Sequence, residues 1–426
     1  MRDNEAKALE LPNTNGLLHR RVFLKGGAAI ASIPFLAAGV SAEDRSAPDL
    51  VPEWTREPGA GMSPYGDRSH HEADVQRNVV SQPGTVGSGA SRTPLQSLEG
   101  MITPNSLHFE RHHNGVPEID PKRHQLLIHG MVKRPLTFDL DNLGRYPMVS
   151  KMLFIECSGN SAALLAENPV QASVGELHGL VSCANWAGIP LSSLFEEAGV
   201  DPAAHWVIAE GADAALMSRS IPLEKIMDDG LLALYQNGER LRPENGYPMR
   251  LLLPGWEGNM SVKWLRRLKV VSEPAMTKDE TSKYSDVRPD GKSLLFTFPM
   301  GVKSVITSPS AGMALRDKGI YQITGLAWSG SGRIQRVEVS ADGGATWSEA
   351  ALDSPVLPKA MTRFRMGWNW SGGPAVLQSR AIDETGAVQP SREAWLAERG
   401  RNAVYHYNAI QSWQILQNGD VRNVYV

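Results

Sequence analysis

The sequence predicts a mixed α+β domain followed by an all-β sandwich of the immunoglobulin type. Between residues 99 and 300, short apolar segments with strand character alternate with loops and a few short helical segments, without the regular alternation of a Rossmann domain. From residue 301 to residue 426, short alternating strands separated by turns take over, and their total length suits one sandwich. With 21% charged residues and a net charge of −3, the chain has no global excess of positive charge for binding nucleic acid or an anionic membrane.

The first segment, residues 1–42, has the features of an export signal. His19–Lys25 contains paired arginines, and an apolar run from Gly26 to Val40 is followed by small residues up to Ala42. A basic, then apolar, then small-residue order is typical of a cleavable signal, and the apolar run is too short for a membrane span. The paired arginines resemble a twin-arginine signal, which exports proteins already folded. We therefore expect a periplasmic protein without a membrane span.

Residues 43–98 are rich in proline, glycine, serine and aspartate and show little periodicity, so we predict an extended arm. In the α+β region, the clearest helix signals are Leu191–Ala198, which ends at Gly199, and Pro222–Met227, which begins with a proline. No glycine-rich phosphate-binding motif follows a strand, which argues against a nucleotide site. The strongest strand signals in this region are His124–Gly130, Ser150–Glu156 and Arg250–Leu253.

The sandwich is predicted from strands separated by turn signals. Tyr321–Trp328 and Ile334–Ser340 alternate as strands, and Asp342–Gly344 is a hairpin-turn signal after which Thr346–Trp347 enters the next strand. The region contains no cysteine, which is common in sandwiches outside antibody domains.

The chain has two cysteines, too few for a disulfide framework, and lacks the C-x-x-C-H motif for c-type haem attachment. Cys157 follows a predicted strand and opens a Gly-Asn turn, where backbone can approach a ligand closely. Its thiolate would suit a redox metal, whereas a lone cysteine is more often a buried structural residue. Cys183 lies in an apolar strand and is predicted to be core. A disulfide between the two remains an alternative in an oxidising compartment.

The pattern Cys157-x-Gly-Asn, followed about 25 residues later by Val181–Leu191, resembles the sulfite oxidase family. The resemblance extends from about residue 100 to the C-terminus. It implies an α+β sulfite-oxidase-like molybdopterin domain over residues 99–300 and an immunoglobulin-like dimerisation domain over residues 301–426, with one molybdenum–molybdopterin per chain and a homodimer. Further stretches match in family order, namely Phe109–His113, Glu210–Asp213, Ser220–Leu223, Asn237–Gly238, Gly246–Arg250, Pro254–Gly255, Val262–Leu265 and Asp342–Trp347.

Within the family, the sequence is most similar to the C subunit of the sulfane dehydrogenase of the thiosulfate-oxidising Sox system. Ile102–Gly115, Gly255–Met260 and Lys278–Tyr284 carry this resemblance. It implies that a carrier-protein-bound sulfane sulfur is oxidised with water as the oxygen source. Because this chain has no haem motif, the electrons would pass to a dihaem c-type cytochrome, the D subunit, for which the predicted arm is a candidate contact surface.

The resemblance also implies roles for individual residues. Cys157 is the expected metal ligand, Tyr284 the active-site tyrosine and Arg111 the arginine of the substrate pocket. Taken without the resemblance, Tyr284, Arg250 and Lys263 are ordinary surface residues and Asp213 a turn residue. The residues expected to bind the cofactor are Phe109, Arg111, His112, His113, Asp213, Asn245, Arg250, Ser261 and Lys263.

The sequence departs from the family pattern at positions that affect substrate choice. Ser161 and Ala162 stand where sulfite oxidases usually have arginines, and Asn245 stands in place of a histidine. A less cationic pocket is less suited to free sulfite, a small dianion. The remaining pocket arginine of the family is either Arg363 or Arg365, between which the sequence does not decide.

Three other functions are compatible with parts of this pattern. The first is a periplasmic sulfite dehydrogenase that converts sulfite to sulfate with a cytochrome c acceptor. The second is a sulfoxide reductase of the same family, although the periplasmic methionine sulfoxide reductases lack the C-terminal sandwich. The third is a non-catalytic binding or scaffold protein that kept the fold.

Overall fold

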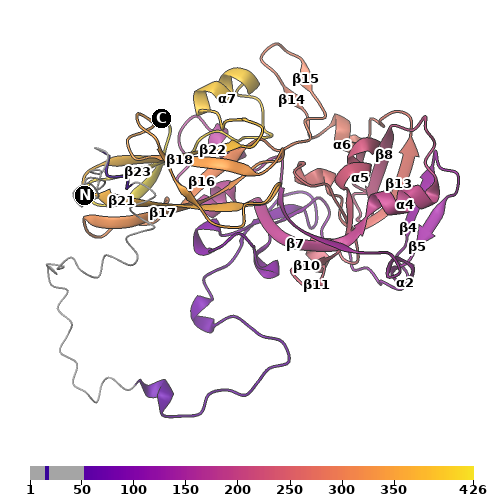
Figure 1. The fold of residues 1–426 in the computed structure, drawn as a ribbon, viewed down its shortest axis with the longest axis horizontal. Coiled ribbons are helices and arrows are strands. Elements are labelled where there is room, and N and C mark those ends of the chain that lie inside the picture. The colour runs from indigo at the N-terminus through magenta and orange to yellow at the C-terminus, as the bar shows by residue number, and fades with distance from the viewer. Residues whose placement is uncertain (1–14, 19–51) are drawn as a thin grey trace, which may run out of the picture. The chain divides into compact units, whose positions relative to one another are not determined.

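The computed structural model describes residues 15–18 and 52–426 (Figure 1). These residues belong to two compact units: residues 52–75 lie in the smaller one, and residues 15–18 with 76–426 form the larger one. The paired arginines and apolar run of the predicted export signal lie outside the described residues. Within the described ranges, no helix has the length and apolar character needed to cross a membrane.

The predicted arm is shorter than expected, because its last part folds with the larger unit. Residues 52–75 contain two short 3-10 helices, η3 (Glu53–Thr55) and η4 (His70–Glu72). From Gln76 onward the chain belongs to the larger unit. There β1 (Asn78–Ser81) and β2 (Gly89–Arg92) form an antiparallel sheet with β3 (Glu110–His112). The small and polar residues of these strands carry no apolar alternation, so the sequence pattern did not predict them.

The α+β region contains two five-stranded sheets, one of them wholly antiparallel and the other with one parallel pair, β4 with β13. The first consists of β6 (Val149–Glu156), β7 (Val181–Pro190), β10 (Leu231–Gln236), β11 (Glu239–Arg240) and β12 (Arg250–Leu252). The second consists of β4 (Leu126–Gly130), β5 (Leu136–Phe138), β8 (Trp206–Gly211), β9 (Ser218–Pro222) and β13 (Leu265–Val271). The helices are α2 (Leu140–Leu143), α3 (Val174–His178), α4 (Leu191–Ala198), α5 (Leu223–Asp229) and α6 (Lys278–Thr281).

The strongest local signals in this region are confirmed. Helix α4 ends as predicted, because Gly199 adopts φ 68°, a left-handed conformation that costs glycine little and that closes the last turn. Helix α5 begins directly after Pro222, whose extended backbone leads into the first turn. Strand β6 ends at Glu156 and so delivers Cys157 to the following turn, as the sequence indicates.

The C-terminal region is a sandwich of two antiparallel sheets, as predicted. One sheet contains β16 (Lys303–Ser308), β17 (Gly319–Trp328), β20 (Ala351–Leu352) and β21 (Thr362–Trp370). The other contains β18 (Ile334–Ser340), β19 (Ser348–Glu349), β22 (Ala375–Asp383), β23 (Ser412–Ile415) and β24 (Val421–Val424). The turn after β18 places Gly343 and Gly344 at φ 71° and 91°, conformations that favour glycine. A hairpin of β14 (Asp286–Val287) and β15 (Ser293–Leu294) precedes the sandwich, and α7 (Arg392–Arg399) follows β22.

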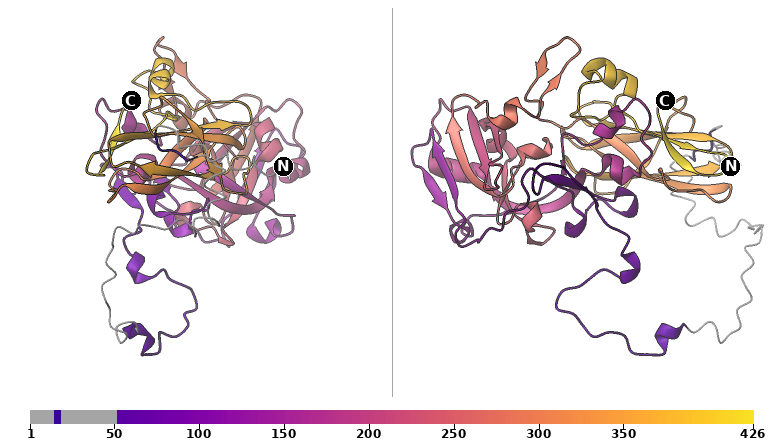
Figure 2. Two further views of the ribbon diagram at one scale, coloured as in Figure 1. Left: turned by 60° about the vertical axis from the view of Figure 1, so that its left-hand side comes forward. Right: turned by 180° about the vertical axis from the view of Figure 1, so that it is seen from behind.

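The two regions of the larger unit lie at its opposite ends, with β7 reaching between them (Figures 1 and 2). Strands β6 and β7 present different faces to the two sides. Phe154 and Cys183 belong to the core of the sandwich, whereas Ile155 packs in a small apolar cluster with Trp186 and half-buried Cys157. The alternation of strand residues therefore fixes Cys157 on the side away from the sandwich core.

Candidate active site

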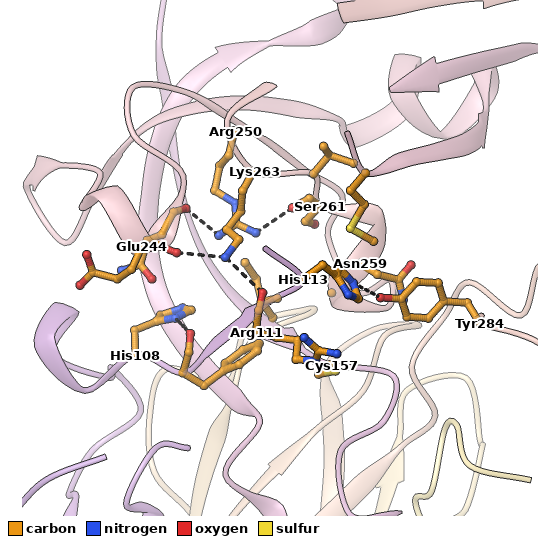
Figure 3. A pocket seen from close by; sticks show the side chains of 16 residues that line it. His108, Arg111, His113, Cys157, Glu244, Arg250, Asn259, Ser261, Lys263 and Tyr284 are labelled. Carbon is orange, nitrogen blue, oxygen red and sulfur yellow. Dashed lines mark hydrogen bonds between the residues drawn. The ribbon is translucent and has the colours of Figure 1, made fainter. Parts of the chain in front are cut away.

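A cavity opens beside Cys157 (Figure 3). Its walls come from the segment before and within β3, the end of β6, the β8–β9 turn, the stretch from Glu244 to Lys263, and the loop after α6. The lining residues are His108, Phe109, Arg111, His113, Ile155, Cys157, Met217, Glu244, Asn245, Arg250, Gly258, Asn259, Ser261, Val262, Lys263 and Tyr284.

The turn after β6 holds Cys157 at the cavity wall. The Cys157 backbone N–H donates to the Leu180 carbonyl at 2.9 Å, and the Asn160 N–H donates to the Cys157 carbonyl at 2.8 Å. Burial raises the pKa of the Cys157 thiol, and the positive charge of Arg111 acts in the opposite direction. A cation at the cavity would complete the stabilisation of the thiolate.

Both cysteines are free thiols, so the structure contains no Cys157–Cys183 disulfide. Cys183 is fully buried in the sandwich-side core, as predicted, and burial raises its pKa to about 12. Only Cys157 therefore faces a space that could hold a ligand.

Arg250 and Lys263 form a positively charged wall of the cavity. Arg250, 4% exposed, donates to the backbone carbonyls of Asn245 at 2.9 Å and Ser261 at 2.8 Å. Lys263 Nζ lies 2.8 Å from His112 Nδ1 and donates to two carbonyls. Burial lowers the pKa of Arg250 to about 9 and places the pKa of Lys263 well below its usual value. Neither residue is an ordinary surface charge, so that alternative does not hold.

Among the described residues, burial alone shifts the pKa of Arg250, and the negative charges of Glu110 and Asp213 act on Lys263 without forming an ion pair with it. No carboxylate in the part of the chain that the structure describes forms an ion pair with Arg111, Arg250 or Lys263. A cation removed from water without a counter-charge is costly. The wall is therefore suited to an anionic ligand, such as a phosphate group.

Three buried polar atoms around the cavity also have no partner among the described residues: His108 Nε2, Asn245 Nδ2 and Arg250 Nε. An unsatisfied buried polar group costs about 1–3 kcal/mol. Burial lowers the pKa of His108 to about 3, so the ring is neutral, and its Nδ1 lies 3.1 Å from the Phe109 carbonyl. Nδ1 therefore donates and Nε2 is left as an acceptor. The site offers two free donors and one acceptor, which fits a phosphorylated heterocycle.

A second wall carries Tyr284, which lies in the loop after α6 with φ 56°. Its phenol oxygen is 3.0 Å from His113 Nε2 (Figure 3). Lys283 Nζ is 3.2 Å from His113 Nδ1. Burial raises the pKa of Tyr284, so the phenol keeps its proton. Tyr284 is thus a neutral hydrogen-bonding group at the cavity and not the surface tyrosine that its polar loop favours.

Arg219 supports Tyr284 from behind and was not predicted. The Arg219 guanidinium lies 4.7 Å from the centre of the Tyr284 ring and forms ion pairs with Glu280 and Glu257. It also donates to Asn259, which lines the cavity. Arg219 is fully buried at the start of β9. The stretch Ser220–Leu223 beside it was recognised, but nothing in the local pattern indicates that Arg219 meets α6.

The outer side of Cys157 borders a second opening. Cys157, Arg111, His113 and Tyr284 line both spaces. The other residues of the outer opening are Val80, Gln82, Gly89, Ala90, Arg92, Gly159, Leu180, Lys283 and Tyr405. In the register of the small sheet, Val80 lies opposite Ala90, and Ala90 opposite Arg111, so one face of β1–β2–β3 forms a wall of this opening.

The sandwich contributes Tyr405 to this opening, and neither of the two arginines expected there lines either space. Arg363 is buried and donates to the carbonyls of Gly100 and Leu98. Arg365 pairs with Asp353 and Glu99. Strand β21 directs both side chains toward the segment before β3 and not toward Cys157. The sequence alone could not predict this direction.

Most of the predicted cofactor-binding residues meet at the cavity, with two exceptions. Phe109, Arg111, His113, Asn245, Arg250, Ser261 and Lys263 line it. Asp213 does not, because its carboxylate accepts the Met217 N–H within the turn after β8, the turn role that the sequence left open. His112 points between Glu110 and Lys263 and supports the wall from outside. His108, Met217, Glu244 and Asn259 line the cavity but were not predicted, although His108 and Asn259 lie in recognised stretches.

Two family profiles match this chain in the order of its two folded regions. Residues 113–278 match "Oxidoreductase molybdopterin binding domain", and residues 296–413 match "Mo-co oxidoreductase dimerisation domain". The expected fold class, a molybdopterin domain followed by a dimerisation sandwich, is thus confirmed.

Similar proteins are found among both sequences and structures. Mitochondrial sulfite oxidase of Mus musculus is 33% identical over 364 residues, 79% of this chain and 66% of that protein. NADH nitrate reductase of Solanum lycopersicum is 32% identical over 348 residues, 72% of this chain and 38% of that protein. The chain thus spans less than two thirds of these curated relatives. The crystal structure of the sulfane dehydrogenase SoxCD from Paracoccus pantotrophus superposes with a TM-score of 0.86 at 45% identity, covering 89% of this chain and 98% of that chain.

Proposed function

Because this chain belongs to the sulfite oxidase family of molybdopterin oxidoreductases, we propose that it is a molybdenum enzyme of sulfur oxidation. Its substrate is a sulfane sulfur bound to a carrier protein, water is the source of oxygen, and a c-type cytochrome receives the electrons. The observation that carries this proposal is the convergence of Arg250, Lys263 and three unpartnered polar atoms on a cavity that ends at the free thiol of Cys157.

The residues present fit molybdopterin, a pterin that carries a phosphate and binds molybdenum through a dithiolene. Arg250 and Lys263 would hold the phosphate, with Ser261 beside them, while Asn245 and His108 offer hydrogen-bonding atoms to the ring system. Cys157 would bind the metal as a thiolate. When bound, the cofactor supplies the two-electron oxidation of sulfur.

Arg111 and Tyr284 would act on the substrate from the outer opening. Arg111 provides a fixed positive charge for an anionic sulfur group, and Tyr284 provides a neutral donor beside Cys157. Val80 and Leu180 add apolar surface, and Arg92 and Lys283 add positive charge. An opening with both kinds of surface favours a sulfur atom attached to an organic group over a small inorganic dianion.

Oxidation of sulfite to sulfate is the second candidate, and the sulfite oxidase relatives support it. Two observations favour the sulfane substrate. The similarity to the SoxCD structure is 45% identity, against 33% for mouse sulfite oxidase. Ser161, at a position where sulfite oxidases usually have an arginine, is 3% exposed and accepts a hydrogen bond from Lys303, so it adds no charge to the opening.

A cytochrome partner follows from electron transfer in single steps, since this chain has two cysteines and no haem-attachment motif. The similarity to the sulfane dehydrogenase SoxCD supports a cytochrome subunit as the partner here. We propose further that two copies associate through the sandwich, which matches a dimerisation domain, and that the enzyme works in the periplasm. Residues 52–75, with Trp54, Met62 and Tyr65 exposed, are the proposed contact for the cytochrome. If a protein that lacks residues 52–75 still associates with the cytochrome, these residues are not the contact.

The test is quantification of molybdenum and pterin in the exported protein, followed by turnover with cytochrome c and either free sulfite or a persulfide-bearing carrier protein. We expect one molybdenum per chain, loss of turnover in Cys157→Ser and retention of the cofactor in the matched control Cys183→Ala. Rapid turnover of sulfite alone would favour sulfite dehydrogenase. A natively exported protein without molybdenum would overturn the proposal and leave a binding or scaffold protein.

A further inference from the structure

We propose that Lys283 fixes the tautomer of His113, so that the phenolic hydrogen of Tyr284 is directed into the space beside Cys157. The inference rests on the proposed function, in which Tyr284 faces the substrate. It assigns Lys283 as a positioning residue that acts through His113.

The first step is the hydrogen bond between Lys283 and His113. Lys283 Nζ lies 3.2 Å from His113 Nδ1. A lysine ammonium has three donors and no acceptor, so Nδ1 must accept. Burial, followed by the charge of Arg111, lowers the pKa of His113 to about 3, so the ring is neutral and carries one hydrogen. That hydrogen therefore lies on Nε2.

The second step concerns the direction of the hydrogen bond between His113 and the phenol of Tyr284. His113 Nε2 is 3.0 Å from the Tyr284 oxygen, and Nε2–H donates to it. The phenol oxygen is then an acceptor toward His113, and its own hydrogen is free to point elsewhere. In the opposite tautomer, Tyr284 would donate to His113 and present only lone pairs to the substrate, which would repel an anionic sulfur group.

The ring of Tyr284 is held in place independently of Lys283. The Arg219 guanidinium lies 4.7 Å from the centre of the ring, and the Tyr405 ring lies 5.6 Å away. Arg219 is in turn fixed by Glu280 and Glu257. A change at Lys283 should therefore alter the direction of the hydrogen bond more than the position of Tyr284.

The test uses three variants of the full-length protein. Lys283→Arg keeps a group with donors and no acceptor toward His113, whereas Lys283→Glu replaces it with an acceptor and should move the ring hydrogen to Nδ1. Lys278→Glu is the matched control, because this exposed residue of α6 receives the same charge change and has no hydrogen bond to His113 among the described contacts.

Nitrogen-15 NMR of labelled histidine reports the tautomer directly, with the His113 signals identified by their loss in His113→Gln. We expect a protonated Nε2 in the wild type, Lys283→Arg and Lys278→Glu, and a protonated Nδ1 in Lys283→Glu. A protonated Nδ1 in the wild type, or an unchanged tautomer in Lys283→Glu, would overturn the inference. This measurement needs no turnover, so it is independent of the proposed function.

Turnover of the molybdenum-loaded protein is the second readout. Lys283→Glu should lower kcat about tenfold or more, the effect of losing one hydrogen bond to a charged group, whereas Lys283→Arg and Lys278→Glu should stay within about threefold of the wild type. Equal losses in Lys283→Glu and Lys278→Glu would show an effect of charge alone and contradict the positioning role.

Discussion

Lys303, at the start of the sandwich, donates a hydrogen bond of 3.1 Å to the carboxylate of Glu156, the residue that precedes Cys157. Both side chains are 1% exposed. Trp328 and Asn160 also donate to Glu156, and Lys303 donates to Ser161 and the Tyr407 carbonyl. The sandwich thus holds the turn that carries the proposed metal ligand, and four predictions follow from this and the other contacts of the site.

Removing Lys303 should destabilise the protein strongly. Lys303→Met leaves the Glu156 carboxylate buried without its cation, which costs about 3–5 kcal/mol in the free energy of unfolding. Lys359→Met removes a lysine from the more exposed pair with Asp229 and should cost about 1 kcal/mol or less. Denaturant unfolding of both variants measures the difference. Similar losses of unfolding free energy would show that the Glu156–Lys303 pair stabilises the protein no more than the exposed pair does.

Replacing Arg250 should reduce cofactor content without unfolding the chain. Arg250→Met removes the buried cation of the cavity wall, and we expect the pterin content to fall about tenfold or more, since charge-assisted hydrogen bonds contribute about 1.5–3 kcal/mol. Arg266→Met, which changes a 43%-exposed arginine on β13, is the control and should retain the wild-type content. Full pterin loading of Arg250→Met would contradict a phosphate site at this wall.

The cofactor-free protein should lose stability in acid partly through His108. Burial lowers the pKa of His108 from 6.5 to about 3, so the unfolded chain binds a proton that the folded chain does not between these two pH values. Stability is therefore complete above pH 6.5 and declines as the pH falls toward 3, by several kcal/mol at most. His108→Phe should remove about one proton from the uptake on unfolding near pH 5. An unchanged pH dependence of the unfolding free energy would contradict this assignment.

A larger side chain at position 89 should disturb the substrate opening while leaving the cofactor in place. A Cβ at this position would lie 2.6 Å from the Val80 carbonyl oxygen, so Gly89→Val must separate β1 from β2. Arg111 lies in the adjacent strand, and its guanidinium donates to Gln82 beside β1. We expect KM to rise about tenfold with the molybdenum content unchanged, whereas Gly373→Ala, where an added Cβ would meet only Ser371 Oγ at 4.0 Å, should match the wild type. If Gly89→Val and the wild type have equal KM values, the small sheet does not take part in substrate binding.

The fold class and the position of Cys157 at the end of a strand could be predicted from the sequence because their signals are local. Strand alternation gave β6 and β18, a glycine with positive φ ended α4, and the ordered stretches from Phe109 to Lys263 indicated the family and most residues of the cavity. Asp213 was assigned through its neighbours in a matching stretch, although its carboxylate serves its own turn. Resemblance identifies a segment, but it does not give the direction of each side chain.

The sequence by itself determined that Cys157 ends a strand and meets a turn, because hydrophobic periodicity and glycine conformations act over a few residues. Only the tertiary structure decided that β1 and β2, read as part of an arm, form a wall beside Cys157, and that Lys283 and His113 meet at Tyr284. Lys283 and His113 are 170 positions apart and His113 and Tyr284 are 171 positions apart, so their meeting depends on long-range packing that leaves no local pattern.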